Sequence, residues 1–178
     1  KDAQPYIDYL LKEKVLIGLH GMGFNSYELL QEEANRLKSM LPQHYPLGIR
    51  NHYLRMNEST LEIMEKTGFL YDSTYYTTDN AKYYAADTVF LQGSIWEIPI
   101  NIMDAGFVTN NQKELIDIKI KTLAKIQKAE NNNQPFFVIH FHDIYFSEAY
   151  PVYKEWYEWL ISYFLEQNYE FIDFLQAL

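Results

Sequence analysis

The chain of 178 residues contains no cysteine. Disulfide bonds, thiolate metal ligands and cysteine nucleophiles are therefore excluded, while the compartment stays open because a cysteine-free protein suits either redox environment. No apolar run approaches the roughly 18 residues that a membrane-spanning helix needs, and no basic segment followed by an apolar one opens the chain. We expect a cytoplasmic protein, with export as the alternative if a leader preceded Lys1.

Positive charge is scarce, since 15 Lys and Arg stand against 24 Asp and Glu, a formal net charge of −9. A phosphate backbone or an anionic membrane surface is repelled on average, which argues against nucleic-acid and membrane partners. Because the chain has only 5 histidines beside its carboxylates, any metal must be held by His, Asp or Glu. Nothing in the sequence fixes an oligomeric state.

No internal repeat and no Pro-, Gly- or Ser-rich linker divides the chain, so we predict a single domain over residues 1–178. Short apolar runs alternate with amphipathic stretches, which predicts an α/β fold with a parallel sheet and right-handed crossovers. The predicted strands are 14–20, 47–52, 69–74, 94–100, 135–142 and 169–173. The predicted helices are 25–40, 57–67, 112–130 and 150–167. Residues 75–93 are predicted to be a long loop, with a short helix inside it as the alternative.

Helix ends carry local signals. Asn25 is the predicted N-cap of the first helix, and Ser59 with Glu62 has the spacing of a capping box. Gly68 ends the second predicted helix. In the last helix, aromatic side chains at near-helical spacing favour core packing over a sugar-binding platform.

Four of the five histidines fall at the carboxyl ends of predicted strands: His20, His52, His140 and His142. The fifth, His44, lies in a loop. Functional groups gather at such ends in parallel α/β folds. Imidazole and carboxylate donors suit a catalytic divalent metal with an open position for water. We therefore expect the imidazoles to gather around one pocket.

Each of these residues also has a structural interpretation. A lone His20 after an apolar strand is more often a hydrogen-bonded core or loop histidine than a ligand. His140 and His142 alternate along a strand and share a face, so one of them is expected to be structural. Asp72 suits the cap of a turn, and Arg50 suits a pair with a surface carboxylate. The sequence lacks a phosphate-binding loop, a Gly-x-Ser-x-Gly elbow and a His-Glu-x-x-His helix.

Five segments, in order along the chain, resemble motifs of the polysaccharide deacetylase family (NodB-like, carbohydrate esterase family 4). They are IGLHG at 17–21, GIRNHYLR at 48–55, GFLYDST at 68–74, WEIP at 96–99 and VIHFHD at 138–143. The set looks closest to a divergent branch that carries GxRxHYLR and is sometimes tied to surface-polysaccharide biosynthesis. The resemblance implies a distorted (β/α)7-type barrel.

The same resemblance implies a metal-dependent hydrolase that removes an acetyl group, N- or O-linked, from a carbohydrate. The implied cofactor is a divalent metal, Zn²⁺ with Co²⁺ or Ni²⁺ as alternatives, and the implied partner is an acetylated carbohydrate. By motif position, His20 is a metal ligand and His142 is the general acid. The backbone N–H of Tyr53 would form part of an oxyanion hole, and Arg50 would orient the catalytic carboxylate.

Four further positions are assigned to substrate binding. Asp72, Asp104 and His140 stand at or near predicted strand ends, and Trp96 belongs to the WEIP segment. The tyrosine-rich segment 75–84 is a second candidate for a sugar-binding groove, with plain packing as the alternative.

The chain departs from the family pattern at three places. The T-F-D-D-G motif, which supplies the base and a metal-binding Asp, would precede residues 14–20 and is absent. We expect a preceding segment with the first strand or strands, because a barrel without them exposes open edges; the alternative is a protein without the usual base. Phe24 replaces the second metal histidine. His52 replaces a proline, and is either a substitute ligand or a hydrogen-bond partner of a substrate hydroxyl or a carboxylate.

Two other classes of function compete with the enzyme. A catalytically degenerate domain of the same fold would bind glycans without chemistry, consistent with Phe24 and the absent Asp pair. A structural partner domain has only the aromatic segment 150–167 in its favour, and needs that segment to be exposed.

Overall fold

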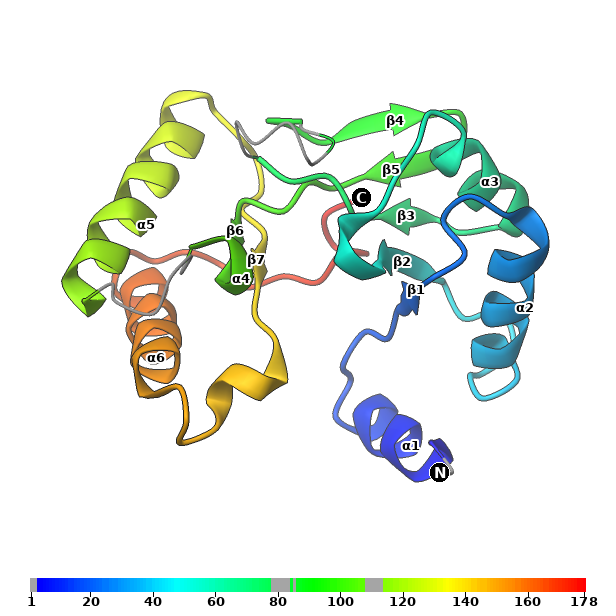
Figure 1. Cartoon of the computed structure of the whole chain (residues 1–178), viewed down its shortest axis with the longest axis horizontal. Coiled ribbons are helices and arrows are strands. Elements are labelled where there is room, and N and C mark those ends of the chain that lie inside the picture. The colour runs from blue at the N-terminus through cyan, green and yellow to red at the C-terminus, as the bar shows by residue number, and fades with distance from the viewer. Residues whose placement is uncertain (1–2, 78–83, 85, 108–113) are drawn as a thin grey trace. The chain divides into compact units, whose positions relative to one another are not determined.

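The structure is a computed structural model that describes residues 3–77, 84, 86–107 and 114–178. The chain divides into two compact units. The first comprises Lys1–Pro99 with Asp173–Leu178, and the second comprises Ile100–Ile172. Each unit is described by itself (Figure 1).

The first unit is built on a five-stranded sheet with the order β1-β2-β3-β5-β4. Its strands are β1 (Leu19–Gly21), β2 (Gly48–Asn51), β3 (Tyr71–Asp72), β4 (Phe90–Gln92) and β5 (Ile95–Glu97). The β1–β2, β2–β3 and β3–β5 pairs are parallel, whereas β4 is antiparallel to β5. A mixed α/β fold with a mainly parallel sheet is therefore confirmed.

The β4–β5 hairpin corrects the prediction of a loop over residues 75–93. Its two-residue turn is Gly93 and Ser94, and Gly93 has φ 60°, a left-handed conformation that glycine adopts without strain. The backbone N–H of Ser94 donates to the Glu65 carboxylate at 2.7 Å, which holds the turn against the end of a neighbouring helix.

Four helical segments accompany this sheet. They are α1 (Gln4–Lys12), which the sequence pattern did not predict, α2 (Tyr27–Lys38), the 3₁₀ turn η1 (His52–Leu54) and α3 (Thr60–Thr67). The predicted Asn25 cap is wrong, because Ser26 is the N-cap of α2 and its hydroxyl accepts the Leu29 N–H at 3.3 Å.

The capping box predicted for α3 is also wrong. Ser59 occupies the N-cap position but makes no side-chain cap bond there. Asn57 organises this turn instead: its side-chain oxygen accepts from Ser59 N–H at 3.0 Å and from the Thr60 hydroxyl at 2.9 Å. Gly68, with φ 85°, ends α3 in the left-handed conformation, as predicted.

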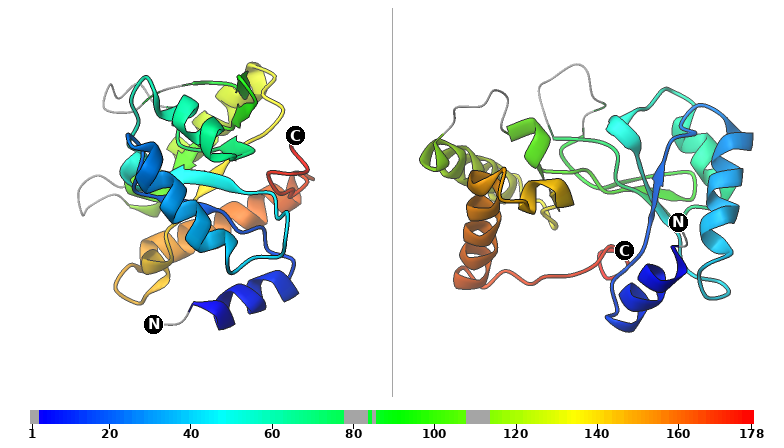
Figure 2. Two further views of the ribbon diagram at one scale, coloured as in Figure 1. Left: turned by 90° about the vertical axis from the view of Figure 1, so that its right-hand side faces the viewer. Right: turned by 60° about the horizontal axis from the view of Figure 1, so that its bottom comes forward.

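The core of the first unit lies where α2 and α3 pack together and against the sheet (Figure 2). Leu30 and Ala34 form the buried stripe of α2, and Leu61 and Met64 that of α3. Spacings of three and four residues place each pair on one helix face. Ile49, from β2, is among the strand side chains that join this core.

The second unit contains the parallel pair β6 (Ile102–Met103) and β7 (Ile139–His140). Its helical segments are α4 (Asp104–Phe107), α5 (Leu115–Asn131), η2 (Asp143–Phe146) and α6 (Pro151–Glu166). The strand predicted over 135–142 is thus reduced to two half-buried residues. The strand predicted over 169–173 is not formed. Residues 112 and 113 of the predicted helix 112–130 lie outside the described part.

The core of the second unit joins α5 to α6, which lie side by side (Figure 2). Trp156, Leu160 and Phe164 are spaced by four along α6 and are buried. The predicted packing role of the aromatic side chains is confirmed for Trp156 and for the partly buried Tyr153 and Trp159, whereas Tyr150 is exposed. The Trp156 indole N–H donates to the Thr122 hydroxyl at 3.0 Å, which satisfies its polar atom inside the core.

A closed (β/α)7 barrel stays a prediction, because the described residues form one five-stranded and one two-stranded sheet. Within the same described ranges, every helix is too short or too polar to cross a membrane.

Candidate active-site residues

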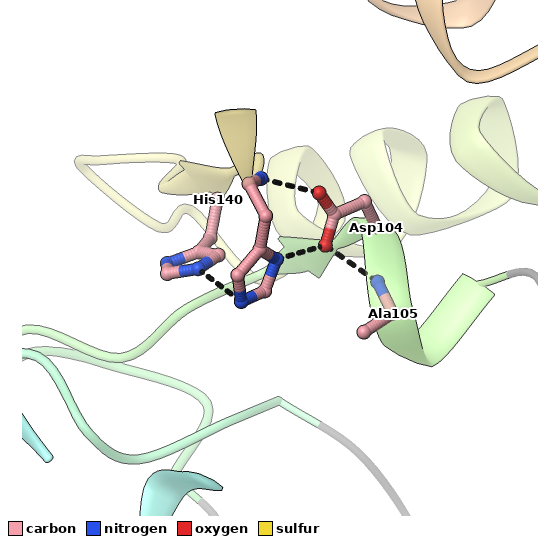
Figure 3. Close-up of polar contacts among 4 residues, drawn as sticks. Asp104, Ala105 and His140 are labelled. Atoms are coloured by element: carbon pink, nitrogen blue, oxygen red, sulfur yellow. Dashed lines mark hydrogen bonds and ion pairs between the residues drawn. The ribbon is translucent and has the colours of Figure 1, made fainter. Parts of the chain in front are cut away.

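Asp104 and His142 meet at the carboxyl ends of two paired strands. Asp104 follows β6 and His142 follows β7, and these strands are parallel neighbours. The Asp104 carboxylate accepts the His142 backbone N–H at 2.5 Å and its ring Nδ1–H at 2.6 Å (Figure 3). The Ala105 N–H donates to the same carboxylate at 2.6 Å.

The contact with Asp104 determines which nitrogen of the His142 ring is protonated. Asp104 is fully buried, whereas the His142 side chain is 40% exposed. Burial raises the pKa of Asp104, and the hydrogen bonds from His142 oppose that rise. Because Nδ1 donates to the carboxylate, Nε2 carries the lone pair of the neutral His142 ring.

His140 approaches the same Nε2 atom. The two histidines alternate along the chain, as predicted for a shared face, and their Nε2 atoms lie 3.3 Å apart. Tyr145 of η2 meets the His142 ring edge-on at 6.0 Å between centroids. Tyr145 also stacks on Tyr153 of α6, with the two ring centroids 4.2 Å apart. The sequence patterns did not identify this aromatic pair.

His20 and His52 lie together in the first unit. Their rings meet edge-on with centroids 5.0 Å apart. The β1–β2 register places His20 beside Arg50, and His20 Nδ1 contacts the Arg50 carbonyl oxygen at 3.1 Å. A carbonyl only accepts, so Nδ1 carries the hydrogen and Nε2 carries the lone pair. His52 Nδ1 is buried with no hydrogen-bond partner among the described residues.

His20 and His52 are donors of the type expected for a metal ligand, but they are two where a catalytic zinc takes three. Two imidazoles are suitable ligands for Zn²⁺ or a similar divalent ion, and the orphaned His52 Nδ1 is a buried polar atom of the right kind. A catalytic zinc takes three protein ligands, and no cluster of three His, Asp or Glu occurs in the described ranges. The metal therefore stays a prediction.

A second polar cluster joins the ends of three strands. Arg50 from β2 donates through Nε to the Ser73 carbonyl at 2.7 Å and through a terminal nitrogen to the Ser73 hydroxyl at 2.8 Å. The negative charges of Asp72 and Glu97 raise the pKa of Arg50. Desolvation outweighs them and lowers the pKa of Arg50 to about 10, so the guanidinium stays charged at neutral pH.

Asp72 and Glu97 form a buried carboxyl pair in this cluster. Both are fully buried and hydrogen-bonded to each other. The Thr74 hydroxyl donates to Asp72 at 2.5 Å and the Tyr75 N–H to Glu97 at 3.0 Å. The second oxygen of each carboxyl has no donor among the described residues. Burial raises the pKa of both carboxyls, that of Glu97 most strongly, so we infer that the pair holds one proton.

Tyr53 occupies a strained turn directly after His52. Its backbone has φ 57° and ψ 20°, and Leu54 follows with φ 52°. Left-handed conformations cost a non-glycine residue about 1–3 kcal/mol and concentrate at functional sites. The Tyr53 side chain is 69% exposed. Its ring packs on that of His52 with centroids 3.9 Å apart, and the Arg55 guanidinium lies 5.3 Å from the Tyr53 ring centroid.

The residues assigned to substrate binding occupy different environments. Asp72 and Asp104 are buried and bonded to Thr74 and His142 respectively. Trp96 lies half-buried in β5, in register with Tyr71. Their contacts with a substrate stay predictions. Glu97 was missed as a member of the site, although it stands in the WEIP segment that carried the family resemblance.

The structure of this chain is similar in fold to a known protein. No family model matches the sequence, and no curated protein matches it. A “putative polysaccharide deacetylase” from Mycobacterium smegmatis aligns with a TM-score of 0.56 and 17% identity, over 78% of this chain and 53% of that one. The chain has a polysaccharide-deacetylase-like fold. It spans about half the length of that relative.

A second solved structure also aligns with the chain. It is a “putative polysaccharide deacetylase involved in o-antigen biosynthesis” from Bordetella bronchiseptica. It aligns with a TM-score of 0.42 and 16% identity, over 87% of this chain and 72% of that chain.

Proposed function

We propose that this chain carries catalytic residues of a metal-dependent hydrolase that removes an acetyl group from a carbohydrate. The observation that carries the proposal is the Asp104–His142 pair. A buried carboxylate holds a half-exposed imidazole through both its backbone and its ring, at a strand end. The fold shared with a protein named as a deacetylase supports the substrate class.

His142 is the proposed general acid. When the tetrahedral intermediate collapses, the C–N or C–O bond to the sugar breaks and Nε2 gives its proton to the departing nitrogen or oxygen. Asp104 is a positioning residue in this step, because it keeps Nδ1 protonated and stabilises the imidazolium before the transfer. A glycan-binding domain without chemistry needs no such pair, and no contact in the described residues favours that alternative.

His20 and His52 are the proposed metal ligands. A divalent metal held by these two residues would supply Lewis-acid chemistry, that is, it would polarise the acetyl carbonyl and lower the pKa of a water. The contact between His20 Nδ1 and the Arg50 carbonyl directs the Nε2 lone pair toward a metal, in the manner of an outer-shell partner. The Tyr53 N–H is the proposed oxyanion donor, held by the left-handed turn.

Arg50 is proposed to hold carboxylates at the strand ends, and the nearby carboxylates in the first unit are Asp72 and Glu97. Trp96 offers an aromatic surface of the kind that suits a pyranose ring.

Acetate release tests this proposal. The full natural chain, freed of metal and then loaded with Zn²⁺, Co²⁺ or Ni²⁺, is expected to release acetate from acetylated amino sugars or acetylated polysaccharides. His142→Ala is expected to lower kcat by about 10²–10⁴-fold, and the exposed His44→Gln is the matched control. Absence of acetate with every metal, or an unchanged rate in His142→Ala, contradicts the proposal.

A further inference from the structure

A buried amide spans the left-handed turn that carries the proposed oxyanion donor. Tyr53 and Leu54 form this turn, with φ values of 57° and 52°. Asn51 precedes the turn, and its side-chain Nδ2 donates to the carbonyl of Arg55, directly after the turn, at 2.9 Å. We propose that Asn51 is a positioning residue that clamps the two ends of the turn and thereby places the Tyr53 N–H. The catalytic consequence rests on the proposed function; the clamp itself does not.

The turn needs such a support. In the left-handed region the β-carbon crowds the backbone, so a residue with a side chain avoids it, and here two such residues follow each other. Leu54 is buried, but the Tyr53 side chain is 69% exposed, so burial of that side chain offsets little of the strain. The backbone hydrogen bond across the turn, from the Arg55 N–H to the His52 carbonyl, is long at 3.3 Å. A second bond to Arg55 therefore contributes strongly to holding the turn closed.

Asn51 is itself anchored inside the first unit. It is the last residue of β2 and lies in register with Gly21 of β1. Its backbone N–H donates to the Thr74 hydroxyl at 3.0 Å, and that hydroxyl donates to the buried Asp72 carboxyl at 2.5 Å. The clamp therefore connects the paired strands at one end to the Arg55 carbonyl at the other.

The other half of the Asn51 amide indicates which atom this position requires. A carbonyl oxygen only accepts, so the contact with Arg55 places the NH₂ group there and leaves Oδ1 on the opposite side. Oδ1 is buried with no hydrogen-bond partner among the described residues. A β-carbon at Gly21 would stand 3.1 Å from this oxygen, so the glycine leaves room for it. Because an unpaired buried acceptor is costly, we attribute the presence of an amide here to its donor, Nδ2.

The position of the Tyr53 N–H matters most when charge develops on the substrate. In the tetrahedral intermediate the acetyl oxygen becomes an oxyanion, and a hydrogen-bond donor stabilises it only from the correct direction. Without the clamp, Tyr53 and Leu54 relax toward negative φ, and the peptide that carries the Tyr53 N–H reorients. Asn51 makes no bond to substrate in this scheme, so its loss lowers kcat rather than raising KM.

Hydrogen exchange followed by NMR tests the clamp without an assay of activity. In the full natural chain, the side-chain amide of Asn51 is expected to exchange slowly, because it is buried and bonded. Asn51→Leu keeps the branched shape and removes the donor, and is expected to speed exchange of the Arg55 N–H about tenfold, roughly the contribution of one hydrogen bond. The matched control is Thr67→Val, which removes another buried donor of the first unit, the hydroxyl bonded to the Ile63 carbonyl.

Kinetics test the consequence for catalysis. Asn51→Leu is expected to lower kcat for acetate release by about 10- to 100-fold, the size of effect that a small misplacement of a catalytic group produces. KM is expected to change little. Since glycine adopts φ 57° without strain, this factor is expected to be smaller when Asn51→Leu is made in a Tyr53→Gly background. A side chain that only stabilises the fold would give the same factor in both backgrounds.

The outcomes separate the clamp from the proposed function. Rapid exchange of the Asn51 side-chain amide in the full natural chain overturns the clamp, and this measurement needs no variant to fold. Equal exchange of the Arg55 N–H in Asn51→Leu and Thr67→Val also overturns it. An unchanged kcat in Asn51→Leu, or an equal factor in both backgrounds, overturns the positioning role. Slow exchange at Asn51 without any acetate release would contradict the proposed function alone.

Discussion

Asp72 and Glu97 lie opposite each other in the parallel register of β3 and β5, and their buried carboxyl groups hydrogen-bond to one another. With one shared proton the pair carries one negative charge beside the Arg50 guanidinium, so the buried cluster is close to neutral. Removing either carboxyl leaves buried polar atoms without their partners, which is a costly change in a protein interior.

Glu97→Gln is expected to change how stability depends on pH. Burial and Asp72 raise the folded-state pKa of Glu97 well above its ordinary value of 4.5. The folded protein therefore holds a proton that the unfolded chain loses, and the free energy of unfolding falls as pH rises from 4.5 toward the folded pKa. The amide cannot ionise, so the variant is expected to lose this slope.

Denaturant unfolding across the acidic and neutral range measures the effect. Glu62→Gln is the control, because Glu62 is exposed and paired with Lys66 on the surface of α3, which lowers its pKa. An identical slope in Glu97→Gln and the parent chain would contradict the shared proton.

Asp104→Asn is expected to lower kcat for acetate release by about 10²–10⁴-fold with little change in KM, because the amide replaces one of the two acceptor oxygens with an NH₂ donor and no longer fixes the tautomer of His142. Steady-state kinetics measure the split between kcat and KM. Asp143→Asn, next to His142 in the chain and exposed, is the matched control. Full activity in Asp104→Asn would assign Asp104 a purely structural role.

Tyr53→Gly separates the backbone from the side chain. Glycine adopts φ 57° without strain, so the change is expected to stabilise the turn by about 1 kcal/mol. Acetate release is expected to persist, because the proposed donor is the N–H. Tyr9→Gly, at an exposed position inside α1, is expected to cost about 1 kcal/mol instead. Loss of activity in Tyr53→Gly would indicate that the phenol acts.

His20→Gln and His52→Gln are each expected to weaken Zn²⁺ binding by at least about 100-fold, since outer-shell changes alone reach that size. Binding is also expected to weaken below the pH at which imidazoles protonate, because only the neutral ring ligates. Titration calorimetry with metal measures both effects, and His44→Gln is the control. Unchanged affinity in both variants would remove these residues from the metal site.

The sequence predicted the elements whose signal is local. The apolar runs before His20 and Arg50 located β1 and β2, and the aromatic side chains of 150–167 indicated a helix that packs in a core, as Trp156 of α6 does. Those runs overestimated the strands because they report burial, whereas a strand requires a paired neighbour. Residues 15–18 and 135–138 are apolar yet lie outside the paired strands.

Long-range pairings were beyond the reach of sequence patterns. The contact between Asp104 and His142 spans 38 positions and depends on the β6–β7 register. The Glu97 partner of Asp72 depends in the same way on β5 lying beside β3. Residue types at strand ends were enough to nominate Asp72, Asp104 and His142, but not to say which of them touch.

The ring of Tyr71 fills the space above Gly48, where any β-carbon would overlap it, and it stacks on Phe174 at 5.1 Å between centroids. Phe174 belongs to the segment Asp173–Leu178, which completes the first unit after the whole second unit has intervened. During synthesis, residues 100–172 must therefore leave the ribosome before Phe174 can pack on Tyr71 in the first unit. Until then the Tyr71 ring lacks its Phe174 partner, so the first unit cannot be completed before the second unit has been synthesised.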